Sequence, residues 1–329
     1  MNLYQILDPI KPELSAVEAT LQNMARVEYE ILSHMIHYTV SGVGKRIRPA
    51  MILLAAHLYP SNLDRVVSWA AAIEALHTAT LIHDDLVDHA TKRRGRPTIN
   101  ALWAEGASVL VGDYIFAQAA NLAAATGSVN VMQSFAKVLA TILSGEIDQA
   151  FCRSYSLPKR KVYYQRISRK TASLFSVAVR STGVLINAPA SEIEALEQYG
   201  YHFGMAYQII DDVLDFIGEP DSVGKPIGND LREGTITLPV FYFAETHPDH
   251  SALSTYLNGN HNREAAAADL AQAVIDSAAI KNALEEAMTY TRRAAEALSK
   301  MCHLPTHKEL CCLAELMVTE RVSAYMQVV

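Results

Sequence analysis

Apolar residues recur along the chain at spacings of three and four, and the alternating patterns typical of strands are scarce, which predicts an all-α protein. A first helix is expected after Pro12 and up to about Tyr38, and the glycine-containing turn that follows ends at Pro49, a residue suited to opening the next helix. Another helix is expected from about Leu63 through Asp88. Further helices are expected at about 107–125, 129–153, 159–183, 190–217 and 235–246, with alanine-rich helices again at 262–329.

Two stretches interrupt this pattern. The segment GEPDSVGKPIGNDLREG at 218–234 holds too many glycines and prolines for a long helix, and a loop of that length in a compact helical domain is usually functional or disordered. The segment HPDHSALSTYLNGNHN at 247–262 is interpreted as a surface excursion. We find no internal repeat and no separating linker, so the chain is expected to form a single domain over residues 1–329.

Composition limits the classes of protein to which the chain can belong. It has 329 residues, half of them hydrophobic, which is enough for a substantial core in one large domain or two tightly joined ones. A net charge of −7 without a basic stripe argues against a nucleic-acid partner. Four cysteines without CxxC spacing indicate a reduced, cytoplasmic setting. The N-terminus lacks a signal-peptide pattern and no apolar run reaches about 18 residues, so no stable membrane insertion is expected.

Twice in the chain, two adjacent aspartates are followed by a third at i+4. The first triad is Asp84, Asp85 and Asp88, and the second triad is Asp211, Asp212 and Asp215. On a helix these carboxylates share one side, and each like-charged pair costs about 0.2–0.5 kcal/mol even when exposed. Clustered carboxylates suit Mg²⁺, which also bridges to phosphates. A single triad is more often a solvated helix face, but two triads inside apolar segments favour a metal site.

Four groups of cations border helix ends or loops. They are Lys45, Arg46 and Arg48; Arg93, Arg94 and Arg96; Lys170; and Lys225. Any one group alone is more simply a solvated basic turn. Together with Mg²⁺ on the aspartates, arginine forks and lysine charges make phosphate sites. The sequence therefore predicts two phosphate-bearing ligands in one helical cavity.

Seven motifs, in order and at family spacing, resemble those of the trans-type polyprenyl diphosphate synthases over roughly residues 40–240. They are GKRIRP at 44–49, HTATLIHDDLVD at 77–88, RRGRPT at 93–98, GD at 112–113, KTASLF at 170–175, YQIIDDVLD at 207–215 and GKPIGNDLREG at 224–234. The resemblance implies an isoprenoid-synthase-type bundle of about ten or more helices around a deep central cavity. It also implies a chain-elongating prenyltransferase that joins isopentenyl diphosphate to an allylic diphosphate, farnesyl or geranylgeranyl diphosphate.

The resemblance also implies roles for individual residues. Three Mg²⁺ ions would bind the allylic diphosphate through Asp84, Asp88 and Asp211, supported by Asp85, Asp212 and Asp215. Isopentenyl diphosphate would be held by Lys45, Arg48, His77 and Arg94. The allylic diphosphate would be contacted by Arg93, Lys170 and Lys225, with the oxygens of Thr171 and Gln208 facing the nascent carbocation. On its own, His77 would more simply be an interior residue of an apolar helix.

Two positions depart from the family pattern. Thr235 replaces the lysine that usually closes the 224–234 motif, which removes a charge near the allylic diphosphate unless Lys225 and Arg232 compensate. Tyr207 stands where phenylalanine is common, and its added hydroxyl needs a partner if it is buried.

Product length is expected to follow from Ala79 and Thr80, one helical turn before Asp84. Because both side chains are small and point away from the metals, a product of about six to ten isoprene units (about C30–C50) is expected, with octaprenyl favoured. The hydrocarbon would pass deeper, toward Tyr114, Phe116 and Ala117. Such products resemble those that supply ubiquinone or menaquinone side chains. The apolar faces at 107–125 and 129–153 are by default core, and the resemblance favours a homodimer there.

Other interpretations stay open at this stage. A terpene cyclase would not need Lys45, Arg48 and Arg94. A shorter-chain farnesyl or geranylgeranyl diphosphate synthase is another alternative, although in short-chain members of the family bulky aromatic residues occupy the level of Ala79 and Thr80. A non-catalytic subunit of a heteromeric synthase typically loses aspartates from one triad, and both triads are complete. A purely structural helical bundle leaves the joint recurrence of cations and aspartates unexplained.

Overall fold

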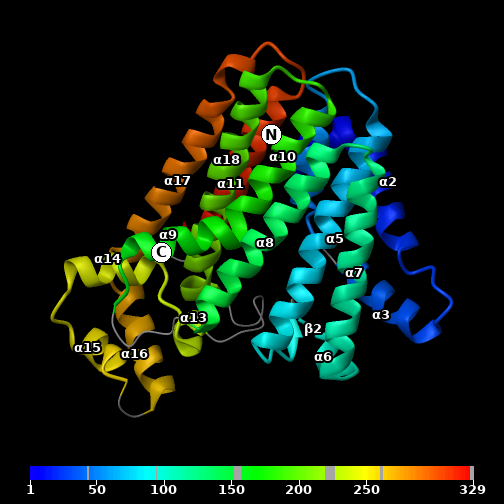
Figure 1. Cartoon of the computed structure of the whole chain (residues 1–329). Coiled ribbons are helices and arrows are strands. Elements are labelled where there is room, and N and C mark those ends of the chain that lie inside the picture. Colours follow the sequence, from blue (N-terminus) through cyan, green and yellow to red (C-terminus); the bar gives the residue numbers. More distant parts are fainter. Residues whose placement is uncertain (43, 94, 152–156, 219–226, 260–261, 327–329) are drawn as a thin grey trace. The chain divides into compact units, whose positions relative to one another are not determined.

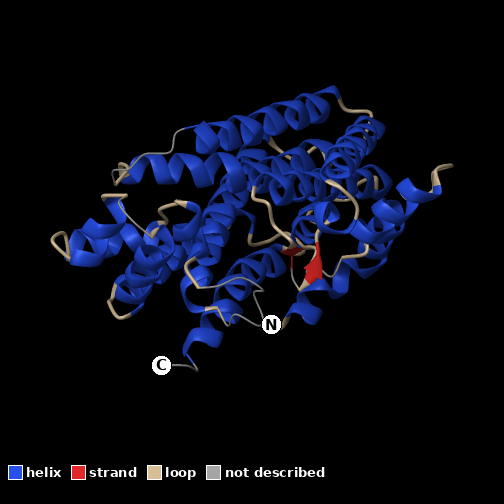
Figure 2. Ribbon diagram, turned by 90° about the horizontal axis from the view of Figure 1, so that it is seen from below, coloured by secondary structure: helices blue, strands red, loops and turns tan. Residues whose placement is uncertain are grey.

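The computed structural model of the chain describes residues 1–42, 44–93, 95–151, 157–218, 227–259 and 262–326. Helices form nearly all of this part of the chain, and the strands within it are a hairpin of two residues each, seen in red in Figure 2. This confirms the all-α prediction. The hairpin lies between the helix expected to run through Asp88 and the helix expected at about 107–125, a stretch for which no element was predicted.

The chain forms two compact units, each assembled from separated segments. Unit 1 comprises Met1–Val138, Phe175–Gln198 and Ala297–Leu313, and unit 2 comprises Leu139–Leu174, Tyr199–Glu296 and Ala314–Val329. The first triad belongs to unit 1 and the second triad to unit 2. The chain passes between the units several times, so neither unit is a continuous stretch of sequence. The single synthase domain over residues 1–329 stays a prediction.

Unit 1 is built around two long helices, α5 (Leu63–Val87) and α7 (Glu105–Ala125), both labelled in Figure 1. Its elements are α1 (Leu3–Leu7), η1 (Asp8–Ile10), α2 (Lys11–Asn23), α3 (Glu30–Val40), α4 (Ile47–Ala56), α5 (Leu63–Val87), β1 (Lys92–Arg93), β2 (Arg96–Pro97), α6 (Ile99–Leu102), α7 (Glu105–Ala125), most of the first half of α8 (Val129–Phe151), most of α10 (Ser173–Leu185), the start of α11 (Ala190–Ile217), η3 (Ser299–Met301) and the start of α18 (His307–Met326). The buried indole of Trp69 on α5 donates a hydrogen bond to the Ala178 carbonyl on α10 at 2.8 Å. Every residue of α4 is buried.

The first predicted helix is wrong in one respect. Where one helix was expected up to about Tyr38, α2 ends at Asn23 and α3 begins at Glu30. The hydroxyl of Ser33 donates to the carbonyl of Ala25 at 2.6 Å and ties the first turn of α3 to the connection. No glycine or proline marks this break, because the residues between the two helices are MARVEY.

Helices α5 and α7 approach closely at one glycine. A Cβ atom placed on Gly112 of α7 would lie 2.2 Å from Nε2 of His83 on α5, a distance that no real pair of atoms tolerates. The ring of His83 also packs against Phe116, with centroids 5.3 Å apart. Buried Ile115 and Ala119 continue this contact face along α7. The absence of a side chain at Gly112 therefore makes room for His83, the residue directly before the first triad.

Unit 2 has its own core. Its elements are the end of α8, α9 (Arg160–Ile167), the π-helical segment η2 (Ser168–Ala172), the start of α10, most of α11, α13 (Asn229–Glu233), α14 (Leu238–Thr246), α15 (Ser251–Leu257), α16 (Arg263–Ile275), most of α17 (Ala279–Ala297) and the end of α18. Phe216, Leu231, Phe243 and Leu270 are buried members of one apolar cluster. The supposed surface excursion at 247–262 is only partly right, because it contains α15, whose first turn is capped by the ring of His250.

The helix predicted at 159–183 is continuous but not regular. Five residues, Ser168–Ala172, adopt the wider π form between α9 and α10. Single π turns inside α-helices occur frequently at functional sites, because the extra residue re-aims the side chains around it. The residues re-aimed here include Lys170 and Thr171. The prediction at 190–217 matches α11 to the residue.

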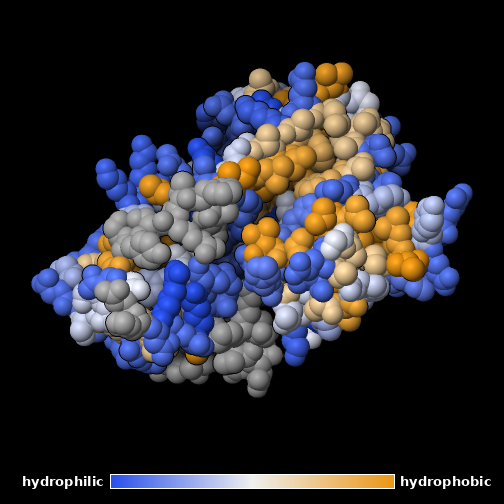
Figure 3. All heavy atoms as spheres, turned by 60° about the horizontal axis from the view of Figure 1, so that its bottom comes forward, coloured by the Kyte–Doolittle hydropathy of each residue, from blue (hydrophilic) through white to orange (hydrophobic). Residues whose placement is uncertain are grey.

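Several large apolar side chains reach the surface of unit 1. Ile31 on α3, Leu102 on α6 and Leu110 on α7 are exposed, and hydrophobic patches are visible beside hydrophilic ones in Figure 3. Among the described residues, no helix combines the length and the apolar character that a membrane crossing requires.

Candidate active site

The first triad occupies the last turn of α5. Asn62 caps the start of this helix by accepting from the backbone N–H of Asp64, and Asp88 ends it, with its own N–H donating to the carbonyl of Asp84 at 2.9 Å. Asp84 is half-buried, Asp85 is buried and Asp88 is exposed. A helix C-terminus carries partial negative charge, so three carboxylates there are unfavourable without cations.

The hairpin after α5 supplies one of these cations. Nε of Arg93 on β1 donates to Oδ1 of Asp85 at 2.7 Å. The guanidinium of Arg96 on β2 lies 4.2 Å from the ring centroid of Tyr38, whose hydroxyl donates to the Pro97 carbonyl at 2.8 Å. The hairpin is therefore fixed between the end of α5 and α3. The structure places Arg93 against the first triad, and Arg94 lies outside the described residues.

The three cations at the start of α4 have different environments. Arg46, in the left-handed conformation at φ 48°, pairs with Glu18 and with Glu74 at 2.9 Å, which ties α2, α4 and α5 together. Arg48 is buried, and its guanidinium lies 4.3 Å from the ring centroid of Phe175. Lys45 is exposed. Arg46 thus serves the fold, whereas Lys45 and Arg48 remain candidates for binding a diphosphate.

The second triad lies in the last two turns of α11. Asp212 is 4 % exposed, and each of its oxygens accepts one hydrogen bond: Oδ2 from the hydroxyl of Tyr163 and Oδ1 from Nε2 of Gln208, both at 2.8 Å. Burial raises the pKa of Asp212 to about 7, although both hydrogen bonds favour the ionised form. Burial and Asp212 together raise the pKa of Tyr163 well above its ordinary value, so the phenol stays protonated and donates.

The third member of the second triad organises the segment that follows. The carboxylate of Asp215 accepts from the backbone N–H groups of Asn229 and Asp230 at 3.2 and 3.1 Å, at the first turn of α13. Gly228, at φ 69°, permits the left-handed turn that brings these N–H groups to Asp215. Burial, then the carboxylate of Asp215, raises the pKa of Asp230. Acidic side chains are therefore crowded together at this end of α11.

The π segment connects Lys170 and Thr171 to their neighbours in unit 2. Nζ of Lys170 lies 2.9 Å from Oε1 of Glu146 on α8. The hydroxyl of Thr171 donates to Oε1 of Gln208 at 2.5 Å, and Gln208 in turn donates to Asp212. The structure thus joins Thr171, Gln208 and the second triad in one hydrogen-bonded chain. Lys225 lies outside the described residues.

Both triads share one arrangement. In each, the middle aspartate (Asp85, Asp212) is buried and held by a donor from another element, while the outer two are more exposed. The donor set fits a hard divalent cation, because clustered carboxylate oxygens are the ligands that such ions prefer. Within the described part of the chain, no three acidic, histidine or cysteine groups converge closely enough to enclose a metal ion by themselves. A bound ion would therefore draw further ligands from water or a phosphate.

The two departures from the family pattern lie in unit 2. The ring of half-buried Tyr207 stacks on Phe203, with centroids 6.4 Å apart. Thr235 follows the left-handed Gly234, and its N–H donates to the Asp230 carbonyl at 2.7 Å. Arg232 pairs with Glu264 at 2.7 Å.

The two positions expected to set product length lie on α5. Ala79 is fully buried, and Thr80 is half-buried with its hydroxyl donating to the His77 carbonyl at 2.7 Å. On α7, Tyr114 and Phe116 are half-buried and Ala117 is exposed.

One residue of the candidate site was not predicted from the sequence. Tyr163 was assigned no role, yet it provides half of the hydrogen bonding to Asp212. A signal was present, because residues 163, 167 and 171 follow at intervals of four and fall on the face that carries Thr171.

Known proteins resemble this chain over most of its length. A sequence profile of the polyprenyl synthetase family matches residues 29–276. The chain is 37 % identical over 242 residues to heptaprenyl diphosphate synthase component 2 of Geobacillus stearothermophilus, covering 74 % of this chain and 76 % of the relative. It is 36 % identical over 242 residues to the octaprenyl diphosphate synthase of Escherichia coli K12, covering 74 % and 75 %. A solved polyprenyl synthase from Caulobacter crescentus CB15, complexed with calcium and isoprenyl diphosphate, superposes with a TM-score of 0.90 at 31 % identity, covering 97 % of this chain and 98 % of that one.

Proposed function

Because the chain belongs to the polyprenyl synthetase family, we propose that its two aspartate triads and the cations near them perform the family's chain elongation. The chain is a chain-elongating prenyltransferase whose relatives make long polyprenyl diphosphates. The observation that carries the assignment of residues is that both triads are complete and have the same arrangement, with the middle aspartate held and the outer two more exposed.

Magnesium is the cofactor that fits the carboxylates of the triads. Three ions bind through Asp84, Asp88 and Asp211, and Asp85, Asp212 and Asp215 support these ligands. When bound, Mg²⁺ neutralises the diphosphate and stabilises it as a leaving group. Asp211 and Asp212 are adjacent acidic groups, and a bound cation would offset the repulsion between their carboxylates.

The cations hold the two diphosphates. Lys45, Arg48, His77 and Arg94 bind isopentenyl diphosphate, and Arg93, Lys170 and Lys225 contact the allylic diphosphate. The packing of Arg48 on Phe175 supports its role, because the ring restrains the orientation of the guanidinium and covers only its face, while bidentate contacts use the N–H donors at its edge. Lys170 exchanges its partner Glu146 for the substrate phosphate.

The chemistry follows from these groups. The allylic C–O bond breaks and its electron pair leaves with the diphosphate, while Lys170 and Arg93 stabilise the charge that develops there. The hydroxyl and amide oxygens of Thr171 and Gln208 face the carbocation. The double bond of isopentenyl diphosphate then forms the new C–C bond, and the adduct loses a proton to the departed diphosphate.

The product is a long all-trans chain of about C30–C50, with octaprenyl favoured, built on farnesyl or geranylgeranyl diphosphate for a quinone side chain. Ala79 and Thr80 on α5 support this length, because neither side chain is bulky enough to stop a growing chain at that level. We further propose that the protein is a cytoplasmic homodimer that associates through α7 and α8. The exposed Leu110 and Leu143 on these helices support that surface.

A second candidate function comes from one relative's name. The Geobacillus protein is component 2 of its heptaprenyl diphosphate synthase, so the present chain is alternatively one subunit of a heteromeric synthase. A shorter-chain synthase is the other alternative.

One experiment separates these possibilities. The purified chain alone is incubated with Mg²⁺, farnesyl diphosphate and labelled isopentenyl diphosphate, and the dephosphorylated products are sized by chromatography. A single long product supports the proposed function. Products of fifteen to twenty carbons would identify a shorter-chain synthase. No incorporation by a folded protein would favour the heteromeric alternative.

A further inference from the structure

We propose that Tyr163 is a positioning residue of the second triad: by holding Asp212 in place, its hydroxyl sets the direction in which Asp211 and Asp215 face. The inference rests on the proposed function, because it assumes that the second triad binds the metal. Tyr163 does not touch substrate in this account, and it acts only through Asp212.

The phenol of Tyr163 is fixed on all sides within unit 2. The residue is 1 % exposed, and its ring packs against Phe241 and Tyr164 with centroids 5.9 and 5.4 Å apart. The guanidinium of Arg166 lies 5.5 Å from the same ring centroid. The hydroxyl thus has little freedom, and it donates to Oδ2 of Asp212 at 2.8 Å.

The other oxygen of Asp212 is held from its own helix. Gln208 donates to Oδ1 at 2.8 Å and is itself oriented by the hydroxyl of Thr171 at 2.5 Å. Two donors on two different helices therefore grip one buried carboxylate. Leaving an oxygen of a buried carboxylate without a donor costs free energy, and any other orientation of Asp212 would do so. The carboxylate therefore has a single favoured orientation.

Holding Asp212 helps to hold the rotation of the last turns of α11, together with the buried apolar residues Ile209, Val213 and Phe216. Successive residues of an α-helix are about 100° apart, so Asp211 and Asp215 share a side that Asp212 only partly shares. The structure agrees, since Asp212 is buried while Asp211 is exposed and Asp215 is half-buried. Anchoring the inward aspartate therefore directs its neighbours outward, toward a metal.

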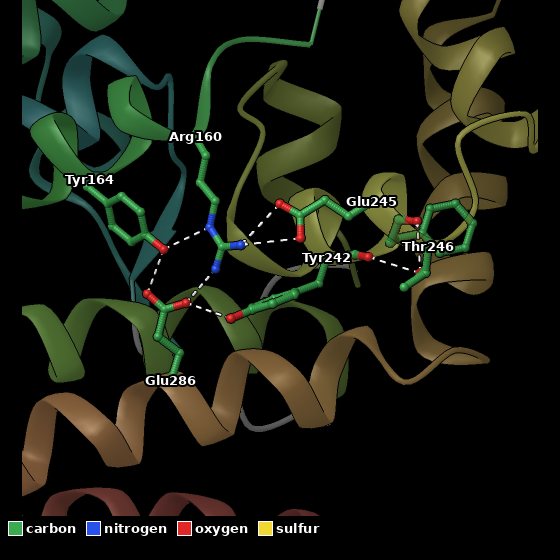
Figure 4. Close-up of polar contacts among 7 residues, drawn as sticks. Arg160, Tyr164, Tyr242, Glu245, Thr246 and Glu286 are labelled. Atoms are coloured by element: carbon green, nitrogen blue, oxygen red, sulfur yellow. Dashed lines mark hydrogen bonds and ion pairs between the residues drawn. The ribbon is translucent and has the colours of Figure 1, made fainter.

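The helix that carries Tyr163 is anchored on its other side by a separate cluster, shown in Figure 4. Arg160 on α9 donates to Glu286 on α17 at 2.5 Å and to Glu245 on α14 at 3.1 Å. The hydroxyls of Tyr164 and Tyr242 donate to Glu286 at 2.6 and 2.7 Å. These bonds tie α9 to α14 and α17.

Two adjacent tyrosines of α9 thus have different partners. Tyr163 bonds to the second triad, and Tyr164 bonds to the Arg160 cluster. Tyr163→Phe removes one buried hydrogen bond, and Tyr164→Phe removes two partly buried ones, the donation to Glu286 and the bond accepted from Nε of Arg160 at 2.8 Å. In both variants the ring stays in place, and only Tyr163→Phe takes a hydrogen bond from the second triad. Tyr164→Phe is therefore a matched control for Tyr163→Phe.

The test measures the rate of isopentenyl incorporation as a function of Mg²⁺ concentration for both variants. Tyr163→Phe is expected to raise the Mg²⁺ concentration at half-maximal rate by about tenfold and to lower kcat, with the KM for isopentenyl diphosphate within about twofold of the starting protein. Tyr164→Phe is expected to lower the melting temperature comparably without changing the Mg²⁺ dependence. Equal Mg²⁺ dependence in the two variants would overturn the inference.

Asp211→Asn separates this inference from the proposed function. If Asp211→Asn raises the Mg²⁺ requirement and Tyr163→Phe does not, the metal site stands and the positioning role is wrong. If Asp211→Asn leaves the Mg²⁺ dependence unchanged, the assignment of the metal to the second triad is wrong, and the inference fails with it.

A second pair of variants keeps the inference testable if Tyr163→Phe does not fold. Thr171→Val removes the hydroxyl that orients Gln208 toward Asp212, whereas Thr171→Ser keeps a donor there. The inference expects Thr171→Val to raise the Mg²⁺ requirement several-fold more than Thr171→Ser does. Equal shifts in the two variants would contradict it.

Discussion

Nε of Arg93 donates to Oδ1 of Asp85 at 2.7 Å, so the hairpin that follows α5 folds back onto the aspartates that end that helix. The pair joins a residue expected to bind substrate to one expected to support the metal. We therefore expect the binding of the allylic diphosphate and the order of the first triad to depend on each other.

A double-mutant cycle measures this dependence. Arg93→Ala and Asp85→Asn are each expected to lower kcat/KM, because each leaves a partly buried charge or amide without its partner. The double variant is expected to lose less than the sum of the two, with a coupling of about 0.5–3 kcal/mol. Steady-state kinetics on the four proteins supply the cycle. Strictly additive losses would show that Arg93 and Asp85 act separately during turnover.

Substitutions of the two arginines at the start of α4, Arg46 and Arg48, are expected to have different effects. Arg48→Lys is expected to raise the KM for isopentenyl diphosphate by about tenfold, because lysine makes no bidentate contact and stacks poorly on Phe175. Arg46→Lys is expected to lower the free energy of unfolding by about 1–3 kcal/mol, because it weakens the bonds to Glu18 and Glu74, and to leave this KM unchanged. Initial rates and urea unfolding of both variants check these expectations. A raised KM in Arg46→Lys alone would reverse the two assignments.

Two glycines on α7 provide a stability prediction with an internal control. Gly112→Ala is expected to lower the free energy of unfolding by about 1–3 kcal/mol, because the new methyl group would meet the ring of His83. Gly106→Ala is expected to raise it by about 0.4–1 kcal/mol, since nothing lies within 4 Å of the added atom and alanine favours helix. Chemical unfolding measures both changes. A stable Gly112→Ala variant would mean that α5 and α7 separate more easily than their packing suggests.

Product length gives a prediction for Thr80. Thr80→Phe is expected to shorten the product by several isoprene units, because a bulky ring one turn before Asp84 obstructs the path of the growing chain. Thr80→Val, which keeps the shape of threonine, is the control and is expected to keep the long product. Chromatography of the dephosphorylated products compares the two. If Thr80→Phe still makes the full-length product, another residue limits the chain.

Much of the helical framework could be predicted from the sequence because long apolar periodicity and clear flanks define it. Helix α11 begins and ends at the predicted residues, and α5 runs from Leu63 to the first triad as expected. The break between Asn23 and Glu30 could not be predicted, because no helix-breaking residue marks it and packing alone decides it. The π segment at Ser168–Ala172 likewise has no local signal.

The candidate site likewise combines features that the sequence predicts with features that only the packing of the elements determines. Aspartate spacing identified the triads, because residues on one face of a helix recur at fixed intervals in the sequence. Neither the pairing of Arg93 with Asp85 nor the donation from Tyr163 to Asp212 could be predicted in this way. These bonds join different elements, and their partners depend on how helices and hairpin pack in three dimensions.

The most direct test of the central claim is the Mg²⁺-dependent incorporation of labelled isopentenyl diphosphate by Asp84→Asn and Asp211→Asn, one change in each triad. Both variants are expected to stay folded and to lose about a hundredfold or more of the rate. Each change removes a carboxylate proposed to bind the Mg²⁺ that stabilises the leaving diphosphate. Asp249→Asn, at an exposed position between α14 and α15, is the control and is expected to keep the full rate. Full activity in either triad variant would contradict the claim that both triads act in catalysis.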